Sequence, residues 1–247
     1  RIPVLTRTDK EAAMAPLPST RQVAPLCFSL AIALLLVLGA AQAKLSPRSF
    51  LVKAGEEQRR LAAGDAGPVL VTGATGATGS LTYKALKEAG VEVRGLVRNV
   101  TKAQELLPCG ECGPEDGIFV GDVTDPDTLT AAFAGARRLV ILTGSFPHRY
   151  PNGSFYFPEG GYPKDVDWQG SNNQVRAAHA AGVEHVLLVS SMGTTEPDSF
   201  LDKLGNGHAL FYKLNGEVDL MASGIPYTVV KPGGLLNDPG GGGGVPL

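Results

Sequence analysis

The sequence predicts an α/β domain with a doubly wound parallel sheet, and three features of the chain support this fold class. From residue 67 onward, short aliphatic and β-branched runs alternate with segments of helical periodicity, as in chains built from βα units. A glycine-rich turn follows the first apolar run. A helix–glycine–strand joint then occurs at Gly90, Gly182 and Gly224, which indicates one repeated unit. We expect the strand order 3-2-1-4-5-6 for this architecture.

The predicted elements follow from these patterns in chain order. Residues 68–72 are continuously apolar up to Thr72 and predict a buried first strand. The helix after it ends at Gly90, because glycine adopts the left-handed cap conformation without a Cβ clash. The other predicted elements are strands at residues 91–97, 118–120, 139–142, 186–190 and 227–230 and a short helix at 128–133.

The composition suits a protein with a full-sized core and excludes some partners. The chain has 247 residues, of which 43% are hydrophobic, and a formal net charge of −2. Because 22 Lys and Arg residues face 24 Asp and Glu residues without a basic run, we expect no nucleic-acid binding. The histidines have no metal-site spacing, and we expect no metal.

The cysteines are too few for a disulfide framework, which predicts a core suited to a reducing compartment. Cys109 and Cys112 stand two residues apart in a segment rich in Pro and Gly. We interpret the pair as ordinary loop residues and keep a redox pair as the alternative.

Both ends of the chain differ in composition from the predicted domain. Residues 1–13 precede the first methionine and are interpreted as readthrough or a fragment end. Residues 14–43 are typical of a signal peptide, with a membrane anchor as the alternative, so membrane contact is expected only if this segment stays uncleaved. Residues 44–66 are a transit-like linker, and together these segments predict a plastid address, with the secretory pathway as the alternative. The domain occupies residues 67–238, and a glycine-rich flexible tail covers 239–247.

The glycine-rich turn between the first strand and the first helix predicts a dinucleotide site. Gly73 permits the tight turn, Gly76 lets the backbone approach a pyrophosphate, and Gly79 allows close packing of helix and strand. The free N–H groups and the positive helix end would hold the phosphate. The same turn contributes Thr75, Ala77 and Thr78 as cofactor-binding candidates.

The end of the second strand favours NADP over NAD. A protein that prefers NAD usually has an acidic residue there for the ribose hydroxyls, whereas this chain has Arg98, which can grip a 2′-phosphate bidentately. Asp122 and Val123 follow the third strand and Thr143 follows the fourth, at the edge where the adenine and ribose would lie. Asp122 is a candidate acceptor for the adenine amino group.

These motifs together resemble the atypical short-chain dehydrogenase/reductases, and within them the plant and algal NAD(P)-binding group related to NmrA-like and epimerase-like proteins. The resemblance implies a Rossmann domain and a C-terminal substrate part that is truncated here. It also places Pro232 and Gly233 near the nicotinamide. The shared stretches are residues 71–79, 95–98, 121–123, 162–163, 166–168, 190–193, 203–207 and 232–235.

The superfamily's Ser, Tyr-x-x-x-Lys and Asn constellation transfers only in part. The resemblance places the lysine at Lys213 and the tyrosine at Ala209, so the usual proton donor is missing. Tyr212 is displaced by nearly one helical turn and is a candidate substitute if its side chain reaches the cleft. The resulting catalytic candidates are Ser191, with Ser190 as the alternative serine, Lys213, which also binds the cofactor, Asp167 in the place of Asn, and Tyr212.

Two functions follow from this reading. The first is an NADP-dependent oxidoreductase or epimerase-like enzyme that acts on a small carbonyl, enone or sugar-derived substrate, with residues 146–168 as a pocket wall or lid. The second is a non-catalytic NADP(H)-binding redox sensor or docking module of a plastid complex, which Ala209 favours. For residues 146–168, a plain solvated insertion is the alternative.

Overall fold

The computed structural model describes residues 67–196 and 199–235, and the predicted address segments and the glycine-rich tail lie outside this part. Its main sheet is formed by β1 (Val69–Thr72), β2 (Val93–Val97), β3 (Ile118–Val120), β4 (Arg138–Ile141), β7 (His185–Val189) and β8 (Tyr227–Val230).

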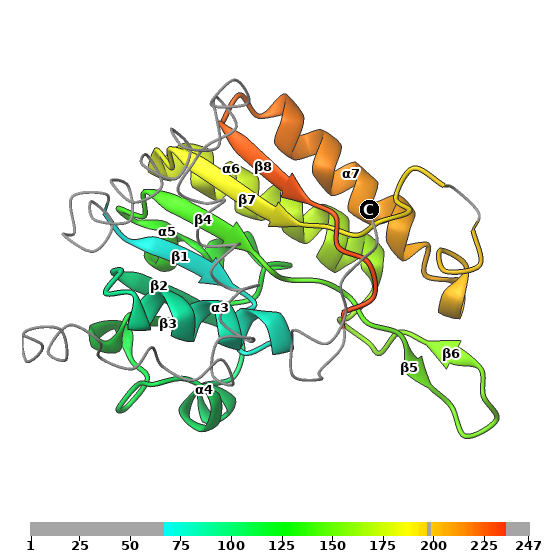
Figure 1. Cartoon of the computed structure of the whole chain (residues 1–247), viewed down its shortest axis with the longest axis horizontal. Coiled ribbons are helices and arrows are strands. Elements are labelled where there is room, and N and C mark those ends of the chain that lie inside the picture. Colours follow the sequence, from blue (N-terminus) through cyan, green and yellow to red (C-terminus); the bar gives the residue numbers. More distant parts are fainter. Residues whose placement is uncertain (1–66, 197–198, 236–247) are drawn as a thin grey trace, which may run out of the picture.

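The six strands are parallel throughout and lie in the order β3-β2-β1-β4-β7-β8 (Figure 1). The predicted order 3-2-1-4-5-6 is therefore confirmed. In the registers, Thr72 pairs with Leu96 on one side and with Ile141 on the other. The carboxyl ends of β1, β2 and β4 therefore meet at one edge of the sheet, where such folds bind ligands.

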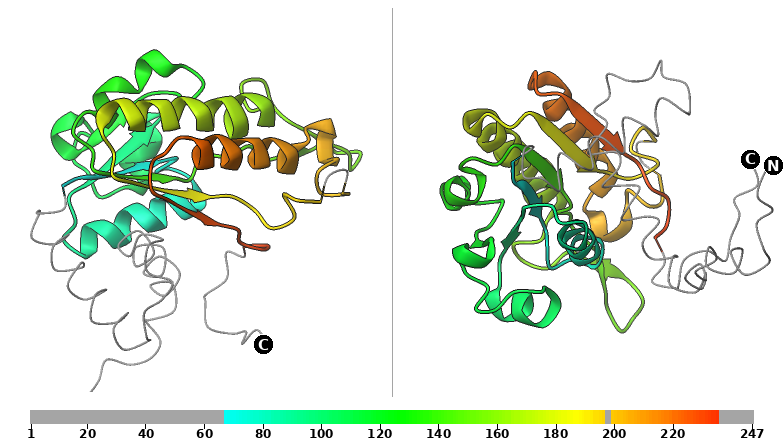
Figure 2. Two further views of the ribbon diagram at one scale, coloured as in Figure 1. Left: turned by 90° about the horizontal axis from the view of Figure 1, so that it is seen from above. Right: turned by 60° about the vertical axis from the view of Figure 1, so that its left-hand side comes forward.

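Helices cover both faces of the sheet because successive strand residues point to opposite sides. Val71 and Val140 belong to one apolar cluster, and Leu70 and Leu139 belong to the other. In Figure 2, α6 and α7 lie on one side of the sheet and α3 on the other. The first cluster includes residues of α3 (Ala77–Glu88) and α4 (Val100–Leu106), and the second includes residues of α5 (Thr130–Phe133), α6 (Ser171–Ala181) and α7 (Ala209–Ala222).

The repeated joints have the predicted backbone conformation. Gly90, Gly182 and Gly224 have φ values of 75°, 70° and 77°. A residue in the left-handed conformation ends each helix and lets the chain turn into the next strand within a few residues. Residues with a Cβ atom adopt this conformation less readily than glycine.

Several short elements escaped the sequence analysis. The α4 helix begins after Asn99, whose side chain accepts a 3.0 Å hydrogen bond from the backbone N–H of Lys102. Within residues 146–168, β5 (His148–Arg149) and β6 (Phe155–Tyr156) form an antiparallel hairpin, which projects beyond the carboxyl end of the sheet (Figure 1). The π-helical turn η6 (Lys164–Gly170) then leads into α6. Short 3₁₀ turns are η4 (Pro114–Asp116), η5 (Pro126–Thr128) and η7 (Leu204–Asn206).

Among the helices of the described part, none combines the length and apolar character needed to cross a bilayer.

Candidate nucleotide-binding cleft

A cleft of about 290 Å³ opens at the carboxyl ends of β1, β2 and β4. It combines the glycine-rich turn, the ends of three strands and the segment that contains the hairpin. Its lining includes the predicted cofactor residues Gly73, Thr75, Gly76, Arg98, Asp122, Val123 and Thr143, and also Lys102, Ser145, Phe146, His148, Pro158 and Val166.

The glycine-rich turn requires glycine at two positions, Gly73 and Gly79. Gly73 has a φ of 67°, and a Cβ on it would lie 2.8 Å from the carbonyl oxygen of Leu142 on the neighbouring strand. A Cβ on Gly79 would collide with the carbonyl of Gly73. This packing presses the start of α3 against the sheet and leaves the backbone at the turn open to a ligand.

The start of α3 has the properties of an anion site. Gly76 is its N-cap, and no acidic side chain occupies the first turn. Ala77 is exposed and Thr78 is partly exposed. The first N–H groups of a helix have no acceptor within it, and the helix dipole adds positive potential at this end. A pyrophosphate therefore fits here without a cationic side chain.

Arg98 and Lys102 place two cations at the β2 side of the cleft. The Arg98 guanidinium lies 3.8 Å from a carboxylate oxygen of Asp122, and its side chain is 69% exposed. Asp122 also accepts hydrogen bonds from the backbone N–H and the hydroxyl of Thr124, at 2.9 and 2.8 Å. Because Asp122 is fixed in this way, it can orient Arg98. The sequence analysis missed Lys102, although its place in a capped turn after Arg98 was a usable signal.

Lys213 and Asp167 form an ion pair next to the cleft, and neither residue belongs to its lining. Lys213 Nζ lies 2.5 Å from Asp167 Oδ1, and the Asp167 side chain is 1% exposed. The other Asp167 oxygen accepts from the backbone N–H of Ser145 at 3.1 Å. A Cβ on Gly144 would lie 3.0 Å from Lys213 Nζ, so the ammonium group sits directly against the end of β4. The structure thus joins two predicted catalytic residues from separate helical segments.

The remaining catalytic candidates are placed differently. The Tyr212 ring stacks on Trp168 at a centroid distance of 5.9 Å, and neither residue lines the cleft. The Ser191 hydroxyl donates to the carbonyl of Met192 at 3.0 Å. Ser190, the alternative serine, shares a small cavity with Asp167 and Lys213. Of the two candidate serines, Ser190 is therefore the one that shares a cavity with the ion pair.

Two predicted residues lie beyond β8, outside the lining of the cleft. The Pro232 carbonyl accepts from the backbone N–H of Met192 at 2.9 Å. A Cβ on Gly233 would lie 3.1 Å from the Met192 sulfur. Their proposed position near a nicotinamide stays a prediction.

Gln174 supports the cleft from behind, and the sequence analysis missed it. Its amide oxygen accepts from the Thr72 hydroxyl at 2.6 Å, and its amide nitrogen donates to the Thr143 hydroxyl at 3.1 Å. Gln174 is fully buried, so the network fixes the ends of β1 and β4 against α6. No motif marks a single glutamine on a helix for this role.

A second ion pair, in which the carboxylate is buried, lies next to Ser190. Glu217 is fully buried, and one of its oxygens accepts from the Ser190 hydroxyl at 2.5 Å. Its other oxygen lies 2.7 Å from Lys231 Nζ, which also donates to the hydroxyl of Thr194 at 2.8 Å. The pair was not predicted, since its members come from α7 and the end of β8.

Comparisons with known proteins agree with this geometry. A family model described as NAD(P)H-binding matches residues 73–246. Sanguinarine reductase of Eschscholzia californica is 42% identical over 200 residues, which cover 70% of this chain and 71% of that protein. A chloroplastic protein of Arabidopsis thaliana is 41% identical over 183 residues and is covered to 54%. The chloroplastic protein TIC 62 of Pisum sativum is 33% identical, over 68% of this chain and 32% of its own length.

A solved structure from Bacillus halodurans, named as a candidate NAD-dependent epimerase/dehydratase, is similar with a TM-score of 0.54 and 29% identity. The match covers 69% of this chain and 72% of that one. The family model, the relatives and the doubly wound fold with its glycine-rich turn point to one assignment. This chain belongs to the NAD(P)H-binding family, as an atypical short-chain dehydrogenase/reductase with a Rossmann domain.

Proposed function

We propose that this protein is an NADPH-dependent reductase that acts on a small acceptor with a conjugated or otherwise activated carbonyl group. The observation that carries the proposal is the pair of cations, Arg98 and Lys102, in the lining of the cleft. Ser145 from the same lining contacts the Lys213–Asp167 ion pair. The two cations can bind a 2′-phosphate. The Lys213–Asp167 pair can bind a ribose hydroxyl and can stabilise a negative charge that develops during the reaction.

The bound cofactor would supply hydride, and the residues of this chain would bind and orient the cofactor and the acceptor. Lys213 donates from a fixed position because the buried Asp167 holds its ammonium group. With Ala209 in the place of the superfamily's tyrosine, proton transfer from that position is absent. Conjugated acceptors suit such a site, since hydride addition to them leaves a charge that an ammonium group can stabilise.

Segment 146–168 supports a pocket wall in this proposal. Phe146, His148 and Pro158 from this segment line the cleft, and the Phe146 side chain is 76% exposed. An exposed aromatic side chain at the mouth of a nucleotide cleft suits a flat apolar substrate.

A docking or sensing role without turnover is the second candidate. Ala209 favours it, and one relative, of Trieres chinensis, is named Photosystem II assembly factor Ycf39. We infer a plastid location on the same grounds, since several relatives are named chloroplastic.

Calorimetric titration with NADPH and NADH tests the cofactor proposal. Arg98→Ala and Lys102→Ala should each weaken NADPH binding about tenfold or more and leave NADH nearly unchanged, because only NADPH carries the 2′-phosphate. Arg137→Ala is the matched control, since Arg137 pairs with Glu184 before the first residues of β4 and β7, at the opposite edge of the sheet. Equal losses for both nucleotides would contradict the NADP preference.

Turnover separates the two candidate functions. Quinones, enones and aldehydes are offered with NADPH while the nicotinamide absorbance is followed. Consumption of NADPH with any acceptor supports the reductase. Tight NADPH binding without consumption across the panel supports the sensing or docking role.

A further inference from the structure

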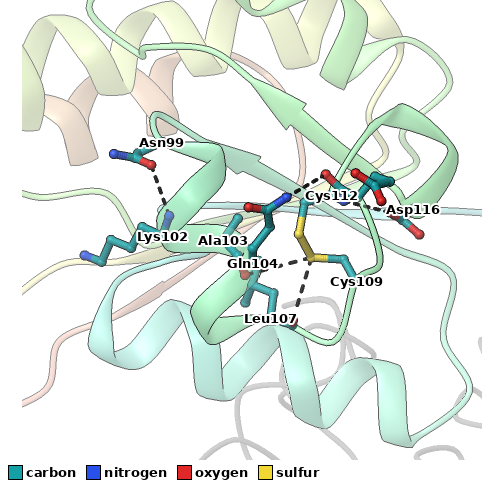
Figure 3. Close-up of a disulfide and its surroundings, with 9 residues drawn as sticks. Asn99, Lys102, Ala103, Gln104, Leu107, Cys109, Cys112 and Asp116 are labelled. Atoms are coloured by element: carbon teal, nitrogen blue, oxygen red, sulfur yellow. Dashed lines mark hydrogen bonds between the residues drawn. A yellow bond between two sulfur atoms is a disulfide. The ribbon is translucent and has the colours of Figure 1, made fainter.

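Cys109 and Cys112 are joined by a disulfide in the loop that follows α4 (Figure 3). The pair was interpreted as ordinary loop residues, with a redox pair as the alternative, and the bond between them is the reason to develop the alternative here. The two cysteine residues differ in exposure. Cys112 is 2% exposed and belongs to the apolar cluster under α3 and α4, whereas Cys109 is partly exposed.

The disulfide loop is attached to the C-terminal end of α4. Cys109 Sγ lies 3.9 Å from the carbonyl oxygen of Ala103 and 3.7 Å from that of Leu107. The Gln104 side chain donates to the carbonyl of Glu111 at 3.4 Å. Ala103 is the fully buried residue of this seven-residue helix, and Val100 and Leu106 pack partly against the same cluster, so the loop adds to the helix's own contacts.

The other side of the loop is attached to the segment before β3. The backbone N–H of Cys112 donates to the Asp116 carboxylate at 2.8 Å. Cys112 has a φ of 56°, a left-handed conformation that is unfavourable for a residue with a side chain. A chain released from the disulfide can leave this conformation, so the loop has a physical reason to open on reduction.

The opposite end of α4 carries part of the nucleotide cleft. Asn99 caps the helix, and Lys102 in its first turn lines the cleft together with Arg98. In Figure 3, Asn99 and Lys102 lie at one end of the helix and the disulfide at the other. A change in the attachment of α4 therefore reaches the two cations through a single short helix.

We propose that Cys109 and Cys112 are a reversible dithiol–disulfide pair whose oxidised form fastens α4 to the domain. A thiolate of a dithiol reductant attacks the accessible Cys109 sulfur, the S–S bond breaks, and Cys112 leaves and takes up a proton. The second thiol of the reductant then displaces Cys109. The protein gains two electrons and two protons, and the reductant becomes a disulfide.

Hydrogen exchange of the full chain tests whether the disulfide holds α4 in place. The experiment uses a Cys27→Ser variant, so that Cys109 and Cys112 are the only cysteines whose thiols are counted. Dithiothreitol should release two thiols, located by alkylation and peptide mass. The disulfide closes a ring of four residues, and closing so short a ring lowers the equilibrium constant for local opening about twentyfold. After reduction, the amides of α4 should therefore exchange about twentyfold faster. Amides of α6 should not change, and reoxidation should restore slow exchange.

A Cys109→Ser/Cys112→Ser variant should show the fast exchange of α4 under both conditions. If this variant does not fold, the comparison of the reduced and the oxidised parent protein still tests whether the disulfide holds α4 in place. Unchanged exchange of α4 on reduction, or two free thiols in the air-oxidised protein, would overturn the proposal.

The consequence for the cofactor rests on the proposed function and is measured separately. Reduction should weaken NADPH binding about three- to tenfold and affect NADH less, because the proposed function assigns Lys102 and Arg98 to the 2′-phosphate. If neither redox form binds NADPH, the cofactor proposal fails while the exchange measurement still decides the fastening. Equal NADPH affinity in both forms would overturn the link between the disulfide and the cleft.

Discussion

The Ser190 hydroxyl donates a 2.5 Å hydrogen bond to the buried carboxylate of Glu217. The bond joins the residue after β7 to the middle of α7, one turn beyond Lys213 on the same helix. Ser190 is thereby held next to the Lys213–Asp167 pair, and its proton is directed toward Glu217. The serine that follows the strand is thus a positioned group whose partner comes from another element.

Glu217→Gln should lower the free energy of unfolding by about 1–2 kcal/mol, because Lys231 loses its ionic partner. The loss is moderate since the Lys231 side chain is 36% exposed and keeps its bond to Thr194. Urea unfolding followed by circular dichroism measures the change. Glu88→Gln, at an exposed position of α3, is the control and should alter stability little. Equal stability of the two variants would mean that the ion pair contributes nothing.

Lys213→Met should reduce turnover of any accepted substrate at least about a hundredfold, because a preorganised charge is removed from the reacting end of the site. Steady-state kinetics at saturating NADPH measures it. Lys87→Met, at an exposed position in the last turn of α3, serves as the control. A fall in NADPH affinity with unchanged turnover would assign Lys213 to binding alone.

Gly79→Ala should abolish tight nucleotide binding, since the new methyl group would collide with the Gly73 carbonyl and push α3 away from the turn. We expect NADPH affinity to fall more than about tenfold, measured by calorimetry. Ser80→Ala, one residue further along the helix, should bind normally. Normal binding by the Gly79 variant would show that the turn tolerates a wider spacing.

Tyr83→Phe should leave stability unchanged or raise it by up to about 1 kcal/mol. The Tyr83 ring is fully buried, and among the described residues its hydroxyl has no hydrogen-bond partner. Burial raises the pKa of this phenol, and the negative charge of Asp116 adds to the shift. Chemical unfolding of both proteins gives the difference. A loss above about 1 kcal/mol would point to a hydroxyl that is satisfied in solution.

We expect the free energy of unfolding to decrease in mild acid because of His185. Burial and the nearby charge of Arg138 lower the pKa of His185 from its ordinary value of 6.5. The unfolded chain therefore binds a proton at His185 more readily than the folded protein does. The contribution of neutral His185 to the free energy of unfolding is fully present above about pH 6.5 and is lost as the pH decreases toward the pKa of the folded state. Thermal unfolding of the parent and of His185→Gln between pH 8 and pH 5, about the range in which histidine titrates, measures it. The variant should lose less of its stability over this range, and parallel curves would contradict the assignment.

The sequence predicted the parts of this molecule that depend on local patterns. The strands, the glycine joints and the turn at Gly73 follow from periodicity and from backbone conformations that favour glycine. The helix α4 was missed because seven residues are too few for a periodic signal, although Asn99 was a usable cap. The two-residue strands β5 and β6 were missed for the same reason.

The polar interior was less predictable because its contacts join distant segments. Lys213 and Asp167 were named through a family resemblance, but their ion pair depends on how η6 and α7 pack. Glu217 was noted only as a neighbour of Lys213 on the helix, and its pairing with Lys231 requires the position of β8. Gln174 carries no motif at all. Such residues are chosen by tertiary packing, which a single sequence does not display.

The central place of β1 affects how this protein is made. One side of β1 pairs with β2, the next strand of the chain, but the other side pairs with β4, which follows β2 and β3 in sequence. During synthesis from the amino terminus, one side of this apolar strand has no partner until β4 leaves the ribosome. An unpaired strand edge invites association with other chains, so the nascent protein has an aggregation-prone interval that a chaperone could cover.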